Sequence, residues 1–249
     1  MDSWRYEPTA DFDKTPIERL KDFPRHPDLL IYTARLVVNL AVRAVLRLWT
    51  RLEIVGRENL PREGSFILVA NHSSHLDAPA ILSALPLRMI HRAFPAAASD
   101  YFFTNLPKLL FSAVVVNAMP FDRKENPRQS LALCRQLLDA PGHILILFPE
   151  GTRTPDGTMA PFKPGIGFLV AGSTFPVVPC YLSGAFRAWP KGRWLPRPHK
   201  VKLLIGPQLQ FQDLRPERDH AVAIADRLYQ AVIAIQTADG RRRTADTRG

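Results

Sequence analysis

The sequence predicts an α/β fold in which helices flank a mainly parallel sheet and an amphipathic helix precedes it. Short apolar runs of strand length, such as 66–70 and 143–148, alternate with longer segments of helical pattern. This alternation is typical of parallel sheets covered by helices on both faces. Clusters of polar residues directly follow two of the apolar runs, and the carboxyl edge of such a sheet is where ligands bind. The 249 residues, 46% of them hydrophobic, suit one such domain with a terminal extension.

The elements follow in order along the chain. Strands are predicted at 52–55, 66–70, 95–99, 112–118, 143–148, 176–182 and 200–205, and helices at 77–85, 127–139, 163–172 and 217–236. The helix at 127–139 has the clearest start, because Asn126 is a good N-cap and Pro127 suits the first helical position. We expect three parts: an arm and first helix over 1–50, the main domain over 51–236, and a disordered basic tail over 237–249.

The first helix, expected over 28–50, carries one polar stripe on an otherwise apolar surface. Its members recur every four residues: Arg35, Asn39, Arg43, Arg47 and Arg51. An apolar face flanked by arginines suits a helix in the headgroup region of a membrane, but a helix packed on its own domain has the same periodicity. The longest uncharged stretch, 36–42, is too short to span a bilayer. Because residues 1–27 do not resemble a signal peptide, we expect a cytoplasmic protein, peripheral on the inner face of the membrane.

The composition indicates an anionic partner. The formal net charge is +10 and the isoelectric point is about 10.1, which suits nucleic acid, anionic lipid or a phosphorylated substrate. The chain has no motif that reads DNA or RNA, so we expect no nucleic-acid partner. The two cysteines, Cys134 and Cys180, lie in apolar surroundings without metal-type spacing, which argues against a disulfide framework or a zinc site.

The polar residues after the run 66–70 include a histidine and an aspartate that are suited to acid–base chemistry. His72 leaves the predicted strand, and Asp77 enters the next predicted helix. A neutral imidazole acts as a base when an acceptor fixes its other nitrogen, and Asp77 across a tight turn can be that acceptor. Asp77 also has a structural alternative, as the N-cap of the helix that contains Pro79.

A second polar cluster follows the run 143–148. Gly151 lets the backbone approach a ligand, Thr152 offers a hydroxyl, and Arg153 offers a planar fork that suits phosphate. The alternative is an ordinary glycine turn with a solvated arginine. Lys163, at the entrance of the next predicted helix, is a weaker candidate of the same kind.

Together these segments resemble the glycerolipid acyltransferase family, which includes the 1-acylglycerol-3-phosphate and lysophospholipid acyltransferases. Its first motif, Asn-His, four residues and Asp, matches Asn71, His72 and Asp77. Its third motif, Phe-Pro-Glu-Gly-Thr-Arg, matches residues 148–153 without a departure, and its fourth block resembles Pro-Val-Val-Pro at 176–179. Its second block is matched more loosely by Pro-Phe-Asp-Arg at 120–123. The resemblance covers residues 51–206 and keeps the order of all four blocks.

The resemblance implies transfer of a fatty acyl group from a thioester donor to the free hydroxyl of a lysophospholipid, first of all 1-acylglycerol-3-phosphate. His72 and Asp77 are then the catalytic pair, while Arg123, Glu150, Gly151, Thr152 and Arg153 bind the acceptor. No cofactor is implied beyond the co-substrate, acyl-coenzyme A or an acyl carrier protein thioester. Another lipid acceptor, such as an amino lipid or a lipid alcohol, and a catalytically silent lipid-binding module remain open.

Two other enzyme classes fit the sequence less well. A metal-dependent hydrolase would need a further ligand beside His72, His75 and Asp77, and only His91 and His143 are available, so we expect no metal. A serine hydrolase would need a Gly-x-Ser-x-Gly elbow, which the chain does not contain.

Overall fold

The computed structural model describes residues 29–98, 116–122 and 127–246. Its centre is a seven-stranded sheet in the order β1-β7-β6-β2-β5-β3-β4. The strands are β1 (Glu53–Val55), β2 (Phe66–Ala70), β3 (Ala93–Ala98), β4 (Met119–Phe121), β5 (Ile144–Leu147), β6 (Val177–Ser183) and β7 (Lys202–Ile205). All neighbouring pairs are parallel except β6 and β7, which confirms the mainly parallel sheet.

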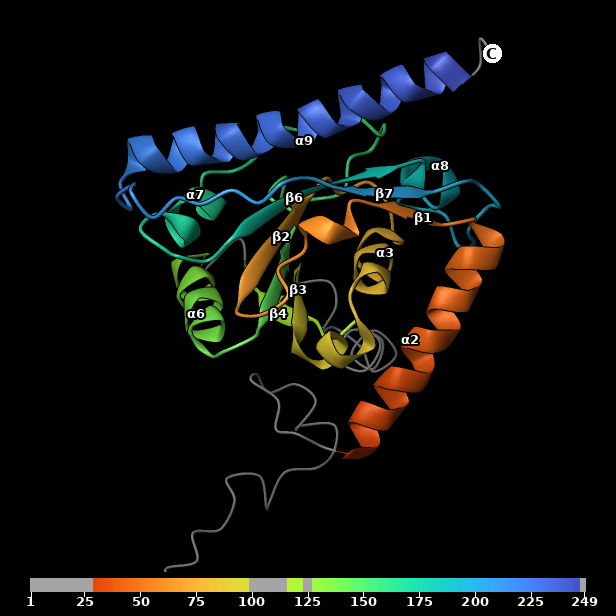
Figure 1. Cartoon of the computed structure of the whole chain (residues 1–249), viewed down its shortest axis with the longest axis horizontal. Helices are drawn as coiled ribbons and strands as arrows, with labels where there is room; N and C mark the ends of the chain where they lie inside the picture. The colour runs from red at the N-terminus through yellow and green to blue at the C-terminus, as the bar shows by residue number, and fades with distance from the viewer. Residues whose placement is uncertain (1–28, 99–115, 123–126, 247–249) are drawn as a thin grey trace, which may run out of the picture.

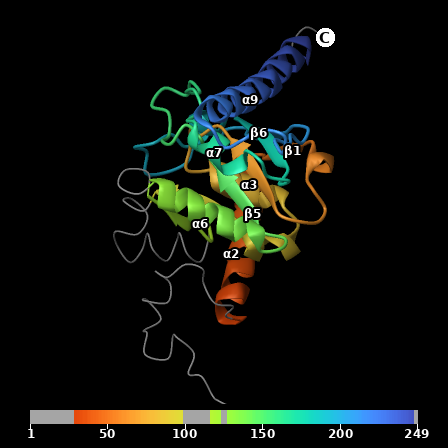
Figure 2. The same cartoon turned by 90° about the vertical axis from the view of Figure 1, so that its left-hand side faces the viewer.

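Helices cover both faces of this sheet (Figures 1 and 2). On β2, Phe66, Leu68 and Ala70 contribute to one core, while Ile67 and Val69 contribute to the other. The first core includes residues of α2 (Leu29–Trp49), α3 (Asp77–Ala84) and α8 (Ala185–Ala188), and the second includes residues of α6 (Pro127–Asp139), α7 (Gly165–Val170) and α9 (Arg218–Asp246). Two short 3₁₀ helices, η1 (Arg57–Asn59) and η2 (Leu87–Arg92), complete the described elements. Strands buried on both faces explain the continuous apolar runs of the sequence.

The predicted ends of the elements agree with the structure at most places, with two corrections. The strand predicted at 112–118 lies partly outside the described residues, and its last three positions are not in a strand, because β4 begins only at Met119. The tail predicted to be disordered from Thr237 is helical as far as Asp246. Asp239 explains this extension, since it is buried and its carboxylate lies 3.4 Å from the Lys202 ammonium on β7.

Helix α2 turns the first three members of its polar stripe toward the protein, whereas the last two, Arg47 and Arg51, are exposed. Arg35 and Asn39 are buried, and Arg43 donates hydrogen bonds of 3.0 and 2.6 Å to the carbonyls of Leu82 and Leu85 at the end of α3. A cation at a helix C-terminus satisfies carbonyls that have no partner within the helix. The stripe therefore attaches α2 to the domain.

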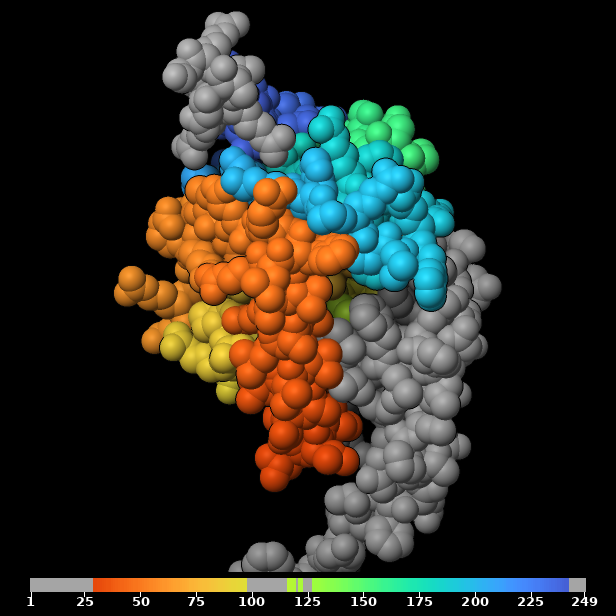
Figure 3. Space-filling model, turned by 90° about the vertical axis from the view of Figure 1, so that its right-hand side faces the viewer, coloured from red at the N-terminus to blue at the C-terminus, as the bar shows by residue number. Residues whose placement is uncertain are grey.

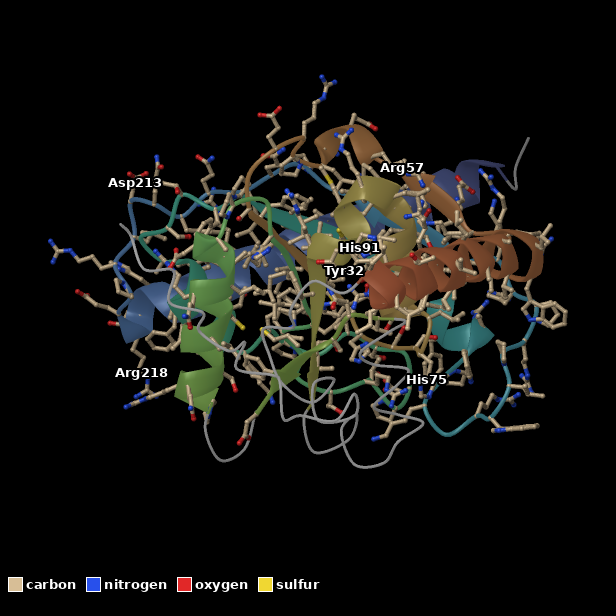
Figure 4. The ribbon with its side chains drawn as sticks, turned by 90° about the horizontal axis from the view of Figure 1, so that it is seen from below. Tyr32, Arg57, His75, His91, Asp213 and Arg218 are labelled. Carbon is tan, nitrogen blue, oxygen red and sulfur yellow. The ribbon has the colours of Figure 1, made fainter. Side chains whose placement is uncertain are left out.

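Near the start of α2, Tyr32 stacks on His91 of η2, with ring centroids 4.3 Å apart (Figure 4). The opposite face of the helix carries exposed apolar side chains: Leu30, Val37, Leu40, Val45, Leu48 and Trp49. The two alternatives for this helix are thus not exclusive, because one face packs on the domain and the other is free to meet a membrane. By length and mean hydropathy of 1.7, this 21-residue helix is also sufficient to cross a bilayer, which corrects the estimate based on its uncharged stretch.

Gly167 on α7 allows that helix to pack closely against α9. A Cβ at this position would lie 2.1 Å from the backbone oxygen of Ala221, an atom that cannot move without displacing α9. Overpacking a core costs about 1–3 kcal/mol of stability. We expect a cost at the upper end here, because the clash is with backbone atoms. We therefore expect Gly167→Ala to lower the melting temperature by about 6–12 °C, at 2–4 °C per kcal/mol for a chain of this size.

Gly165 in the same helix provides the matched control. Its added Cβ would meet nothing nearer than a Leu131 methyl at 3.9 Å, so Gly165→Ala should melt near the wild-type temperature. Circular dichroism measures both melts. If the two variants melted at the same temperature, the close packing of α7 on α9 would be contradicted.

Candidate active site

Both polar clusters leave the carboxyl ends of neighbouring parallel strands. Residues 71–77 follow β2, and residues 148–154 follow β5, which pairs with β2 along its length. The amide N–H of Thr154 donates to the carbonyl of His72 at 3.0 Å, so the two loops are also joined by backbone. The sheet edge that the sequence analysis predicted as the site therefore brings the two clusters together.

His72 and Asp77 form the expected pair. The Nδ1 atom of His72 lies 2.8 Å from the Oδ2 atom of Asp77, and the His72 ring stacks on Phe148 with centroids 4.2 Å apart. The aspartate is fully buried, while the histidine keeps 24% of its side chain exposed. A carboxylate at Nδ1 places the proton of the neutral ring on that nitrogen and leaves Nε2 as the basic atom.

Asp77 is not the helix N-cap, because that position belongs to Leu76 and Asp77 is the first residue of α3. Its Oδ2 atom instead accepts hydrogen bonds from the backbone N–H groups of Ser73 at 2.6 Å and Ser74 at 2.8 Å. One carboxylate oxygen thus fixes the turn that carries His72 as well as the imidazole itself. The N-cap alternative is wrong, yet Asp77 has a structural role in holding this turn, beside the catalytic role predicted for it.

Glu150 fixes the backbone on the other side of His72. Its Oε1 atom accepts from the His72 N–H at 2.6 Å, and its Oε2 atom accepts from the Ala160 N–H at 2.9 Å. Burial raises the pKa of this carboxyl, and the two backbone donors oppose that rise. Glu150 does not line the cavity described below, and its contacts in this structure position His72; its contact with the acceptor stays a prediction.

Asn71 plays a similar part toward β6. Its side-chain amide donates to the Leu182 carbonyl at 3.2 Å and accepts from the Leu182 N–H at 2.7 Å. An amide side chain that pairs in this way imitates one more residue of a strand. Asn71 therefore anchors the start of the histidine turn to the sheet.

The absence of a side chain at Gly151 leaves room for a lysine side chain. Its φ of +77° is favourable only for glycine, and a Cβ there would lie 2.6 Å from the Lys163 ammonium nitrogen. The Lys163 side chain thus crosses directly over the glycine and enters the site. It was a weaker candidate in the sequence, where the eleven residues between Gly151 and Lys163 hide this contact.

Arg153 contacts His75, the second histidine of the first motif. An Nη atom of Arg153 lies 2.6 Å from the His75 ring nitrogens, and that ring is tilted against Trp189 at 5.1 Å. Burial, followed by the charge of Arg153, lowers the pKa of His75 to about 4. His75 is therefore neutral at physiological pH, and it contacts the guanidinium without adding a charge. Figure 4 places His75 on the α2 side of the molecule, away from Asp213 and Arg218.

A cavity of about 1000 Å³ joins these groups to the inner apolar side chains of α2. Ligand cavities of this size are at the upper end of the usual range. The described lining residues include no carboxylate. Their charged and imidazole side chains are those of Arg153, Lys163, Lys191, His72 and His75, and Thr50, Ser74 and Thr152 add hydroxyl groups. Apolar residues of α2, α3, β3 and α7 form much of the remaining wall, including Val38, Val42, Ala78, Ala97 and Ile166.

The predicted acceptor-binding residues thus separate into groups. Gly151, Thr152 and Arg153 line the cavity, Glu150 does not, and Arg123 lies outside the described residues. Within the described part of the chain, no group of three His, Cys, Asp or Glu side chains is placed to hold a metal ion. Cys134 and Cys180 are free and buried in opposite cores, where burial raises the pKa of each thiol to about 12.

Comparison with known proteins identifies the family of this chain. The model of the Acyltransferase family matches residues 51–183, which include both loops of the site but neither the α2 wall of the cavity nor the segment from Trp189 to Pro196. This chain belongs to the Acyltransferase family. The matched residues include both the turn that carries His72 and the loop after β5. The two motifs of the sequence therefore lie within the family match and at the same edge of the sheet.

Individual acyltransferases agree with the family match. A 1-acyl-sn-glycerol-3-phosphate acyltransferase of Bacillus subtilis is 27% identical over 195 residues, which are 77% of this chain and 92% of that protein. One of Limnanthes alba is 30% identical over 165 residues, or 65% of this chain and 56% of that protein, so the chain spans little more than half of some relatives. The crystal structure of the 1-acyl-sn-glycerophosphate acyltransferase PlsC from Thermotoga maritima superimposes with a TM-score of 0.64 at 25% identity, covering 82% of this chain and 79% of that one.

Proposed function

We propose that this acyltransferase moves a fatty acyl group from a thioester donor to the free hydroxyl of 1-acylglycerol-3-phosphate, which gives phosphatidic acid. One observation carries the proposal: His72, held by the buried Asp77, lines an apolar cavity whose described charged residues are all cationic. A hydroxyl acceptor needs a base, its acyl chain needs apolar walls, and its phosphate needs cations. The names of the relatives in Bacillus and Limnanthes support the same acceptor.

In the proposed reaction, Nε2 of His72 takes the proton of the acceptor hydroxyl as its oxygen attacks the thioester carbonyl carbon. The new C–O bond forms, the C–S bond breaks, and the departing thiolate receives the proton from the imidazolium. Asp77, 2.8 Å from Nδ1, keeps the ring in its reactive tautomer and stabilises the imidazolium charge. The acceptor supplies the hydroxyl, so no acyl-enzyme is needed. The donor is acyl-coenzyme A or an acyl carrier protein thioester.

The phosphate of the acceptor would bind at Arg153, with Lys163 beside it. The guanidinium presents a planar pair of N–H donors that matches two phosphate oxygens, whereas the ammonium adds a point charge. His75 holds Arg153 from the other side without competing for the anion, because it carries no charge itself. Arg123 stays a proposed second phosphate ligand.

The membrane is the proposed partner that supplies the acceptor. The exposed face of α2 is apolar, and three of its exposed side chains, Val37, Val45 and Trp49, also line the cavity. Lysophospholipid that enters from the headgroup region would reach His72 along α2. Arg35 and Arg43 of the stripe stay on the protein, so a helix lying at the surface fits this structure better than one crossing the bilayer with these two arginines in lipid. We place the protein on the inner face of the membrane, where thioester donors are found.

The acceptor assignment is tested by replacing Arg153 with alanine. A lost charged hydrogen bond costs about 1.5–3 kcal/mol, so the KM for 1-acylglycerol-3-phosphate should rise about 10- to 150-fold while the KM for the thioester changes little. Arg153→Lys should restore part of the affinity, because lysine keeps the charge and loses the planar fork. Initial rates at varied concentrations of each substrate measure the two constants separately.

Arg187 supplies the control, since it is exposed on α8 and does not line the cavity. Arg187→Ala should leave both constants unchanged. If Arg153→Ala also leaves acceptor kinetics unchanged while phosphate-free lipid alcohols are acylated equally well, the glycerol phosphate acceptor is wrong and the acceptor is a lipid alcohol.

A further inference from the structure

The segment between α8 and β7 exposes large apolar and basic side chains. We call residues 190–199 the tryptophan loop. Trp194 is 87% exposed and Leu195 is 61% exposed, and the neighbouring Arg193 and Arg197 are exposed as well. A tryptophan this exposed is unusual in a folded domain, because exposing its large apolar ring to water costs more free energy than exposing any other side chain of the loop.

The base of this loop is bonded to the catalytic turn. The Trp189 carbonyl accepts from the Ser74 hydroxyl at 2.7 Å and from the His75 N–H at 3.3 Å. The Trp189 indole N–H in turn donates to the Arg193 carbonyl at 2.9 Å, which folds the loop back over its base. The exposed tip is thus held in a fixed place relative to His72 and Asp77.

The tryptophan loop and α2 border the same opening. Lys191 and Pro196 of the loop line the cavity together with Val45 and Trp49 of α2. Figure 3 shows the loop, in cyan, beside the C-terminal half of α2, in orange. The exposed apolar side chains of the loop and of α2 therefore lie on one side of the molecule, around the route to the active site.

The charge of this region selects an anionic surface. No acidic residue occurs between 157 and 212, or between 29 and 52, so both borders of the opening carry only positive formal charge. Tryptophan and leucine beside arginines suit the boundary between lipid headgroups and acyl chains, where rings stay half in water and guanidinium groups meet phosphates.

We propose that the tryptophan loop is a second membrane-contact element, which inserts Trp194 and Leu195 into the headgroup region of an anionic phospholipid bilayer while Arg193 and Arg197 bind lipid phosphates. Together with α2 it holds the opening of the cavity against the membrane. This inference rests on the proposed function for its purpose, which is delivery of the lipid acceptor, but membrane contact itself is measured without turnover.

The experiment compares two double variants with two matched controls. Trp194→Ala/Leu195→Ala removes the apolar tip, and Val222→Ala removes an exposed apolar residue of α9. Arg193→Gln/Arg197→Gln removes two charges, and Arg215→Gln/Arg218→Gln removes two charges at the far end of the molecule, where Figure 4 labels Arg218. Binding is measured by sedimentation with vesicles of phosphatidylcholine that contain phosphatidylglycerol.

We expect the apolar variant to bind these vesicles at least about tenfold more weakly, since each buried apolar group contributes strongly at the interface. Each lost arginine should weaken binding about fivefold, because a basic residue near such a surface contributes about 1 kcal/mol. High salt should diminish the arginine effect through screening and leave most of the tryptophan effect. Brominated lipids should quench the fluorescence of wild-type protein more than that of Trp194→Phe, and both control variants should bind as the wild type does.

Turnover distinguishes this inference from the proposed function. On a short-chain lysophosphatidate dissolved as monomers, the loop variants should keep wild-type rates, and on vesicle-embedded acceptor they should lose rate in proportion to binding. If the wild type acylates neither form, the proposed function fails while the vesicle measurements still stand. If the apolar variant binds vesicles as tightly as the wild type, the membrane assignment is overturned. Loss of turnover only with an acyl carrier protein donor would instead assign the loop to that acidic protein.

Discussion

Replacing His72 by alanine is expected to lower the rate of acyl transfer about 10²- to 10⁴-fold, which is the usual contribution of a positioned general base. The His72 imidazole contacts the buried Asp77 through Nδ1 and also lines the cavity, so its Nε2 atom is left to take a proton. The melting temperature should stay near the wild-type value, because the structural hydrogen bonds of His72 are made by its backbone N–H and carbonyl. Initial rates and a thermal melt measure the two effects.

His220→Ala is the matched control, since this histidine lies in the first turn of α9, does not line the cavity and hydrogen-bonds only to Arg215 among the contacts described. It should acylate at the wild-type rate. If His72→Ala also turns over at that rate, His72 is not the base, and the His–Asp mechanism is wrong.

Replacing Asp77 by asparagine is expected to reduce turnover by a comparable factor with little loss of stability. An amide oxygen in place of Oδ2 can still accept from the Ser73 and Ser74 N–H groups, so the turn is kept. The negative charge that stabilises an imidazolium at His72 is lost, and an amide N–H turned toward Nδ1 would favour the wrong tautomer. In hydrolases that use a Ser-His-Asp triad, the corresponding change costs about 10⁴ in turnover.

Asp77→Ala separates the two roles of this residue. It leaves two buried N–H groups without an acceptor at about 1–3 kcal/mol each, so this variant should lose both turnover and melting temperature. A melt that is equally low for Asp77→Asn and Asp77→Ala would show that the charge stabilises the fold itself. Wild-type turnover in Asp77→Asn would remove the aspartate from the mechanism.

The local sequence was sufficient to predict the sheet and the location of the site. The apolar run at 66–70 and the helix at 127–139 have the ends that the pattern predicts, because burial on both faces leaves a strand few alternatives and a proline fixes a helix start. His72, Gly151 and Arg153 meet because parallel neighbours end at one edge, a rule that needs only the order of the strands.

Local sequence was not enough wherever a residue acts through a distant partner. The stripe on α2 has the same period whether its arginines meet lipid or protein, and only the carbonyls of Leu82 and Leu85 decide that Arg43 meets protein. The helical continuation past Thr237 depends on Lys202, which lies in another strand. Glu150 stands within a binding motif, yet it holds the His72 backbone.

The sequence by itself therefore determined the fold class, the pairing of His72 with Asp77 and the edge of the sheet at which this pair lies, since these depend on periodicity and on short spacings along the chain. Only the tertiary structure decided which side of α2 faces outward, that Lys163 crosses Gly151, and that the tryptophan loop is bonded to the catalytic turn. The physical reason is that hydrogen bonds and burial act between residues far apart in the chain, and a one-dimensional pattern does not state which of them become neighbours.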